Sequence, residues 1–346
     1  MSRARHSSMV QTNPNGMRKT HLLTKILCSA WILLCITSCN SDDVRLPENP
    51  LPDGTALNEL FEDEIENHKQ HFTFNASTGG SVTGDQGTIL EFNADAFTKL
   101  NGDVVTGDVD IELIEIYDRS TMFLTKKPTN GLTGDGTIST LVSGGEFYIN
   151  AMQNGAQLKL VSGFTIIAPT ENTGEIDQDM RLFDGVINCE GNDCDLIWEE
   201  QGDRGIEVGE FQTAGGFKTA YYVFQSKFGW TNIDRWYSDP RPKTKIFVDV
   251  PEGFDNKNCM IYLAYDGEPT VLASFDMYDA DKKLFTEHYG LIPIGLEVHF
   301  ILVSIIDEEI HYAIQSATIQ ENHIEVIDEV ASITQEDLLD LIDDLP

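Results

Sequence analysis

The sequence predicts an all-β protein with two β-sandwich-like domains in tandem, a short helix before the first domain and a short C-terminal helix. Many short segments are rich in β-branched and aromatic residues, and turns rich in glycine and asparagine separate them. Short strands at such spacing are typical of a sandwich. Apolar residues recur at helical spacing near residues 57–65 and 334–342, which predicts the two helices.

Residues 1–39 are expected to be a signal peptide. Basic residues precede the uncharged run Ile26–Ile36, and small residues follow it, which is the order of a secretory signal. The run is shorter than the roughly 20 apolar residues that a membrane-spanning helix needs. Translation starts either at Met1 or at Met17, which begins a more compact signal.

The rest of the chain is expected to divide into five segments. They are an acidic, proline-containing tether (40–54), a helix with a first sandwich (55–170), a loop-rich bridge with a cysteine pair (171–215), a second sandwich-like domain (216–328) and the C-terminal helix (329–346). In the clearest strand, residues 109–116, apolar and acidic side chains alternate. This alternation predicts one buried and one wet face.

Acidic residues greatly outnumber basic ones. The sequence holds 57 Asp and Glu against 23 Lys and Arg, a net charge of −34. Removal of residues 1–39, with five basic and no acidic residues, leaves 18 basic residues and a net charge of −39. Nucleic acid is therefore excluded as a partner, because its binding requires Lys and Arg to neutralise phosphate. The acidity indicates solubility rather than a store of cations, since no long acidic block is present.

The segment Ile36-Thr37-Ser38-Cys39 resembles the lipobox of bacterial lipoproteins. The resemblance implies cleavage before Cys39 and diacylation of its thiol, and two acyl chains anchor a protein stably where one is marginal. The alternative is an ordinary secreted protein with a chance cysteine. Residues 40–43 resemble the acidic export signal of Bacteroidetes lipoproteins, with a plain acidic spacer as the alternative. We therefore expect a lipid-anchored outer-membrane protein that faces the cell exterior.

The body of the chain carries two further resemblances. The first is to the ZU-five β-sandwich of ankyrins and netrin receptors, through Gly79–Thr83, Gly87–Phe92 and Val109–Leu113, although that pattern has Pro at Asn93 and Gly at Asp95. The second is to flavobacterial surface lipoproteins, through residues 111–116, 127–129, 143–151, 229–235 and 293–295. The resemblances imply a location at the cell surface and a sandwich fold. The ZU-five likeness also implies a role in protein–protein contact rather than in catalysis.

Cys189 and Cys194 are separated by four residues, Glu-Gly-Asn-Asp. Outside the cytoplasm two close thiols favour a local disulfide, which stabilises modestly because the closed loop is short. The alternatives are free thiols or a metal site, for which no further Cys or His stands at ligand spacing. Cys259 is then a single thiol that we expect to be buried.

The densest aromatic and polar cluster comprises Trp230, Asn232, Asp234, Trp236 and Tyr237. If exposed, this set suits a glycan, because rings stack on sugar faces while amide and carboxylate oxygens accept hydrogen bonds from hydroxyls. The competing interpretation, which the burial preference of Trp favours, is a strand whose two Trp side chains fill the core. Asp234 and Arg235 then pair at its edge.

No catalytic signature is present, neither a Gly-x-Ser-x-Gly elbow nor a His-Glu-x-x-His pair nor a phosphate-binding loop. No cofactor or catalytic metal is expected; loops such as Asp279-Ala280-Asp281 are explained either by turn chemistry or by structural calcium. We predict a non-enzymatic binding or envelope-assembly role with envelope proteins as partners. The alternative is a carbohydrate-binding accessory lipoprotein of a nutrient-uptake system, whose partners are surface glycans.

Overall fold

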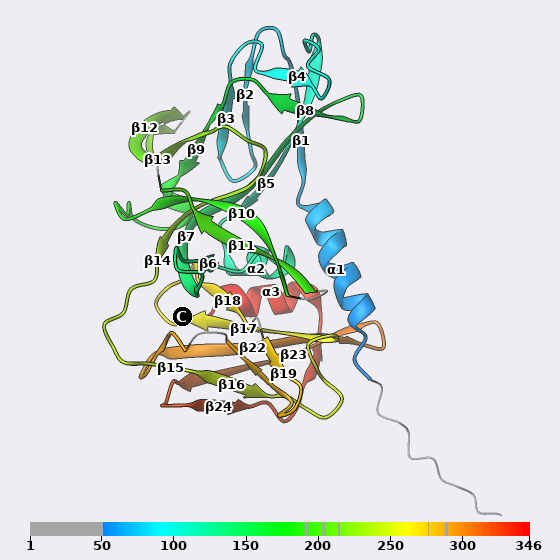
Figure 1. Ribbon diagram of the computed structural model, residues 1–346, viewed down its shortest axis with the longest axis vertical. Coiled ribbons are helices and arrows are strands. Elements are labelled where there is room, and N and C mark those ends of the chain that lie inside the picture. The colour runs from blue at the N-terminus through cyan, green and yellow to red at the C-terminus, as the bar shows by residue number, and fades with distance from the viewer. Residues whose placement is uncertain (1–50, 191–192, 203–204, 214, 276, 288–289) are drawn as a thin grey trace, which may run out of the picture. The chain divides into compact units, whose positions relative to one another are not determined.

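The computed structural model describes residues 51–190, 193–202, 205–213, 215–275, 277–287 and 290–346 (Figure 1). They belong to one compact unit, Asn49–Pro346. Strands account for 52% of the structure and helices for 11%, which confirms the predicted all-β class with a helix before the first domain and another at the C-terminus. The predicted signal peptide, the lipidation site Cys39 and most of the predicted tether lie outside the described residues.

The first sandwich consists of two sheets. Along its main path the first sheet contains β1 (Gln70–Asn75), β5 (Asp108–Ile116), β7 (Ile138–Gln153), β14 (Gly229–Trp236), β10 (Arg181–Glu190), β11 (Asp193–Glu200) and β6 (Asn130–Leu132). Off this path β8 (Ala156–Leu160) pairs with β7, and β4 (Phe97–Lys99) pairs with β8. The second sheet contains β12 (Glu207–Thr213), β13 (Gly216–Gln225), β9 (Phe164–Pro169), β3 (Ile89–Phe92) and β2 (Gly80–Thr83), and the 3-10 helix η1 (Thr170–Asn172) follows β9.

Two further sheets form the second sandwich. The third sheet contains β18 (Leu272–Ser274), β17 (Cys259–Tyr265), β22 (Glu297–Ile306), β23 (Glu309–Thr318) and β25 (Ala331–Ile333). The fourth contains β19 (Met277–Asp279), β20 (Leu284–Thr286), β16 (Ile246–Asp249) and β24 (His323–Val326), and β15 (Lys243–Thr244) pairs separately with β21 (Ile292–Pro293).

Each sandwich encloses its own hydrophobic core. In the first, Ile111 and Phe147 of the first sheet pack with Leu90 and Ile166 of the second. In the second, side chains of β17 and β22 pack with those of β16 and β20. Side chains that alternate along a strand point to opposite faces of its sheet, so each sheet contributes one apolar face to its core.

A third core joins the two sandwiches through three helices, α1 (Gly54–Asn67), α2 (Arg119–Leu124) and α3 (Gln335–Asp343) (Figure 1). Phe61 of α1, Phe123 of α2 and Leu338 of α3 pack there with Ile114 of the first sheet and Tyr262 of the third. The first and third sheets are therefore covered by apolar contacts on both faces.

The helices α1 and α3 occur where the apolar spacing predicts them, and both begin with a side-chain cap. The Asp53 carboxylate accepts from the Thr55 and Ala56 N–H groups, and the Thr334 hydroxyl accepts from the Asp337 N–H. Such caps satisfy the free N–H groups of the first turn.

The predicted division of the chain differs from the observed one. The segment 171–215, predicted as a loop-rich bridge, contains β10, β11 and β12. The strands β13 and β14, predicted to open the second domain, instead pair with β9 and β7 of the first sandwich. These pairings join segments that are distant in sequence, and no local pattern reports them.

The acidic side chains of residues 109–116 do not all lie on the predicted wet face, because two of them are buried. Glu112 and Glu115 are 6% and 2% exposed. Asn150 donates to Glu112 at 2.8 Å, and three donors reach Glu115, among them the Thr88 N–H at 2.9 Å. The acidic side chains are tolerated in the interior because hydrogen-bond donors surround them.

Candidate functional site

The five residues of the predicted aromatic and polar cluster lie on β14 and immediately after it. This strand is central in the first sheet, between β7 and β10. A β-bulge between Asn232 and Asp234 shifts its register against β7. The structure places the five side chains in different surroundings rather than on one flat face.

Trp230 is partly buried and packs against neighbouring side chains. Its ring centroid lies 5.3 Å from that of Tyr148 and 6.3 Å from that of Trp198. The Lys127 Nζ lies 4.9 Å from the centroid of the Trp230 ring and donates to the Thr125 carbonyl at 2.9 Å. Burial lowers the pKa of Lys127 to about 8. These contacts agree with the structural interpretation of Trp230 rather than with a role in glycan stacking.

Asn232 and Asp234 are fully buried. The Asn232 Nδ2 donates to the Asp234 Oδ2 at 2.6 Å, so neither side chain faces a ligand from solvent. The expected pair between Asp234 and Arg235 is wrong. Arg235 instead forms ion pairs with Asp177 at 2.7 Å and Glu268 at 3.2 Å, because successive side chains of a strand point to opposite faces.

Tyr237 packs edge-to-face on Tyr265, with ring centroids 4.9 Å apart, and its hydroxyl donates to Asp239 at 3.3 Å. Burial raises the pKa of Tyr237. Of the predicted cluster, only Trp236 lines one of the described pockets.

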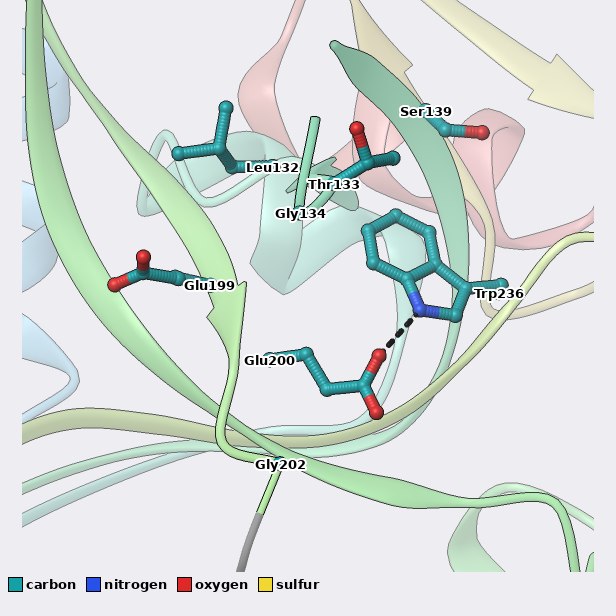
Figure 2. Close-up of a pocket in the computed structure, with 8 residues that line it drawn as sticks. All are labelled: Leu132, Thr133, Gly134, Ser139, Glu199, Glu200, Gly202 and Trp236. Carbon is teal, nitrogen blue, oxygen red and sulfur yellow. Dashed lines mark hydrogen bonds between the residues drawn. The ribbon is translucent and has the colours of Figure 1, made fainter. Parts of the chain in front are cut away.

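That pocket, which we call the Trp236 pocket, is open to solvent and has a volume of about 550 Å³ (Figure 2). Its lining residues are Leu132, Thr133, Gly134, Ser139, Glu199, Glu200, Gly202 and Trp236. They come from the end of β6 and the turn that follows, from β7, from the end of β11 and from β14. None of these eight residues carries a positive charge.

The short strand β6 brings these segments together. It pairs in parallel with β11, where Leu132 lies opposite Glu199, and antiparallel with β7. A Cβ at Gly131 would lie 2.8 Å from Trp236 Cζ3 and 2.8 Å from Leu141 Cδ1. Glycine at this position therefore allows β6 to approach the indole closely enough to form the wall of the pocket.

The indole of Trp236 is held in place on two sides. Its Nε1 donates to the Glu200 Oε2 at 2.7 Å, and its ring meets that of Phe183 edge-to-face with centroids 5.4 Å apart. Figure 2 shows the Glu200 carboxylate directed at the indole and the Glu199 side chain directed away from it. A fixed aromatic ring beside a carboxylate suits a ligand that combines an apolar face with hydroxyl donors.

No sequence pattern marks Glu200 or Thr133 as a site residue. Both are separated from Trp236 by more than thirty residues in the sequence, and the pairing of β6 with β11 and β7 brings them together. The dipeptide Glu199-Glu200 gives no distinguishing signal in a chain with 57 acidic residues.

The predicted disulfide partners lie on a hairpin. The backbone register of β10 and β11 places Cys189 directly opposite Cys194, while their side chains lie outside the described part of the structure. Cys259 is a free, buried thiol, as the sequence predicts, and its Sγ donates to the Asp255 carbonyl at 3.3 Å.

Among the described residues, no group of three or more His, Cys, Asp or Glu side chains is placed to hold a metal ion. None of the described helices is both long enough and apolar enough to cross a bilayer. No protein-family model matches the sequence, and no curated protein matches it either.

Proposed function

We propose that the protein is a non-enzymatic binding protein, anchored in the outer membrane through lipid on Cys39 and displayed at the cell exterior. The support for the anchor is the order of basic, apolar and small residues before Cys39 and the acidic residues after it. The acidic body, with a net charge of −39 after removal of residues 1–39, suits a soluble domain held near a membrane by lipid rather than by its own surface.

The proposed ligand is a neutral saccharide bound in the Trp236 pocket. The observation that carries this proposal is the indole of Trp236, held by Phe183 and by the 2.7 Å hydrogen bond to Glu200 at the wall of an open pocket. A ring fixed before binding loses little entropy when a sugar stacks on it. The negative charge of Glu199 and Glu200 disfavours anionic ligands and favours hydroxyl donors.

A screen of fragment 40–346 against polysaccharides tests the proposal. We expect Glu200→Gln to weaken binding about tenfold or more, because a charged acceptor of a sugar hydroxyl is lost while a hydrogen-bond acceptor remains for the indole. Trp236→Phe, which keeps an aromatic ring against Phe183, should weaken it similarly. Glu207→Gln is the matched control, since this exposed side chain of β12 is not among the lining residues of the Trp236 pocket and its loss should leave affinity unchanged.

Equal affinity of the wild type, Glu200→Gln and Trp236→Phe for every bound glycan would place the site elsewhere.

The second candidate function, envelope assembly, is favoured by a different observation. Ile324 and Val326 on the edge strand β24 are 54% and 46% exposed, and exposed apolar edge strands pair readily with other chains. Absence of glycan binding, together with specific crosslinking of β24 to an envelope protein in cells, would support assembly instead.

A further inference from the structure

Two fully buried carboxyl groups lie on adjacent strands of the first sheet, on the face opposite the first core. Glu146 of β7 and Asp234 of β14 are both 0% exposed. In the register of the two strands Asn232 lies opposite Glu146, and Asp234 lies opposite Ser143. We call Glu146 and Asp234 the carboxyl pair.

The carboxyl pair has too few hydrogen-bond donors for two ionised groups. Both Glu146 oxygens and Asp234 Oδ1 are buried without a hydrogen-bond partner among the described residues. Asp234 Oδ2 accepts from Asn232 Nδ2 at 2.6 Å, and Asn232 Oδ1 in turn accepts from the Ser143 hydroxyl at 3.3 Å. The Ser143 side chain and the Gly144 N–H also lie close enough to act on Asp234, so the shortage of donors is greatest at Glu146. An ionised carboxylate without donors is strongly disfavoured in the interior, whereas a neutral carboxylic acid is tolerated.

Glu115 is a buried carboxyl group of the same sheet that does have hydrogen-bond donors. It is 2% exposed, and its oxygens accept from the N–H groups of Thr88 and Gln86 at 2.9 and 3.0 Å and from Gln70 Nε2 at 2.9 Å. Glu115 and Glu146 are both buried, but only the oxygens of Glu115 accept hydrogen bonds from described donors. The two residues therefore form a matched pair for experiment.

The charges that face the carboxyl pair do not neutralise it. Asp118, the N-cap of α2, adds a third carboxyl group, and Lys127, which follows α2, is the cation that acts on Glu146. The Lys127 ammonium donates to the carbonyls of Thr125 and Lys126, and Lys126 and Asp195 act on Lys127 in turn.

Burial and the neighbouring Asp234 raise the pKa of Glu146 well above its usual range, and Lys127 opposes this only in part. Burial likewise raises the pKa of Asp234 well above its usual range, against the opposing effects of Ser143, Gly144 and Asn232. Both shifts have the same direction, because desolvation disfavours the charged form of each group.

The carboxyl pair lies where the first sheet meets the segment that precedes β18 and the helix α2. The Ser143 N–H donates to the Thr270 carbonyl at 3.3 Å, and Arg235, next to Asp234, pairs with Glu268. The bulge between Asn232 and Asp234 and the positive φ of Gly145 (131°) shape the two strands at this junction. A charge that develops here acts on the contact between the two sandwiches.

We propose that Glu146 and Asp234 keep protons at neutral pH and make the junction between the two sandwiches sensitive to pH. Loss of these protons at higher pH introduces unpaired negative charge between the first sheet and α2 and loosens their packing. The proposal is independent of the proposed ligand and of the lipid anchor.

The sign of the pH dependence follows from the protons bound in each state. In the unfolded chain both carboxyl groups ionise near pH 4, whereas in the folded protein they stay protonated to higher pH. The folded state then binds more protons, so stability falls as pH rises from about 4 through the folded pKa values. Lys127 has the opposite effect above its pKa of about 8, so pH 5 to 8 is the useful window.

Thermal unfolding of the full-length chain between pH 5 and pH 8 tests the proposal. We expect the Tm of the wild type to fall by about 5 °C or more across this range, and that of Glu146→Gln or Asp234→Asn to fall clearly less. Glu115→Gln is the control. It should lower the Tm at every pH without changing the slope, because it removes an acceptor that several N–H groups need.

Infrared difference spectra of the folded wild type provide a second measurement if a variant fails to fold. A protonated-carboxyl C=O band should be present at pH 7, weaken in Glu146→Gln and persist in Glu115→Gln. Parallel Tm curves for the wild type and both carboxyl-pair variants would overturn the proposal, as would the absence of a protonated-carboxyl band at pH 7.

Discussion

At the scale of single residues, Arg119 shows how one side chain joins distant parts of the chain. It is 1% exposed, and its guanidinium donates to backbone carbonyls of Tyr265, Glu268 and Val271 as well as to those of Leu345 and Pro346. The fork of five N–H donors suits such a cluster of carbonyls. Arg119 thus ties α2 to the segment before β18 and to the residues after α3.

Replacement of Arg119 by Met should lower the free energy of unfolding by about 3 kcal/mol, because several buried carbonyls lose their donor at once. Urea unfolding measures the change. Lys126→Met is the control: Lys126 forms an ion pair with the exposed Asp195 at 3.0 Å, and its loss should cost less than about 1 kcal/mol. Equal losses for the two variants would contradict the proposed role of Arg119.

Local sequence could not have identified this residue. Arg119 follows Asp118 in a segment with no strong pattern, and its acceptors lie 146 to 227 residues away in the sequence. The same holds for Glu200, which becomes part of the Trp236 pocket only through the indole hydrogen bond. In contrast, the burial of Cys259 was predictable, because a single thiol at the start of an apolar strand is usually inside.

At the scale of elements, long amphipathic segments were predictable and short buried ones were not. The helices α1 and α3 each present an apolar stripe to the third core, so their pattern is visible in the sequence. The helix α2 has only six residues, all of them buried, and therefore lacks a polar face that would reveal it. The hairpin of β10 and β11 was predicted as part of a loop-rich bridge, because its neighbours in the sheet, β14 and β6, lie far away in the sequence.

The β10–β11 hairpin leads to a prediction about the cysteines. Because Cys189 and Cys194 lie opposite each other in register, we expect alkylation of the folded, non-reduced protein to modify neither thiol. Reduction should lower the free energy of unfolding by about 2 kcal/mol, as a short closed loop implies. The buried Cys259 serves as an internal control that reacts only after unfolding. Labelling of Cys189 and Cys194 without a reductant would contradict the disulfide.

At the scale of the whole molecule, the described residues build a large apolar core between the two sandwiches in addition to the core inside each of them. A smaller cluster of Leu141, Phe183 and Trp198 lies beside the Trp236 pocket. The third core explains why strands with acidic residues are buried on both faces. Two independent sandwiches would leave the outer faces of the first and third sheets exposed to water. The observed structure covers them with α1, α2 and α3, so the two sandwiches depend on each other for burial of apolar surface.

The proposed anchor also belongs to this scale, because it determines where the whole protein resides. Cys39→Ala should move the protein from the membrane fraction to the soluble fraction and abolish labelling by a fatty-acid analogue, since two acyl chains provide the attachment. Cys35→Ala, in the same apolar run, is the matched control and should leave both readouts unchanged. Membrane association that persists in Cys39→Ala would contradict lipid anchoring at this residue.

The sequence by itself determined the all-β class, the two terminal helices and the burial of Cys259, because these depend on local composition and periodicity. Only the tertiary structure decided which strands belong to which sandwich and that Asp234 and Glu146 are buried. It also decided that, of the predicted cluster, Trp236 lines one of the described pockets. The physical reason is that strand pairing and burial depend on contacts between residues far apart in the chain. A local pattern reports only which faces are apolar, and not what covers them.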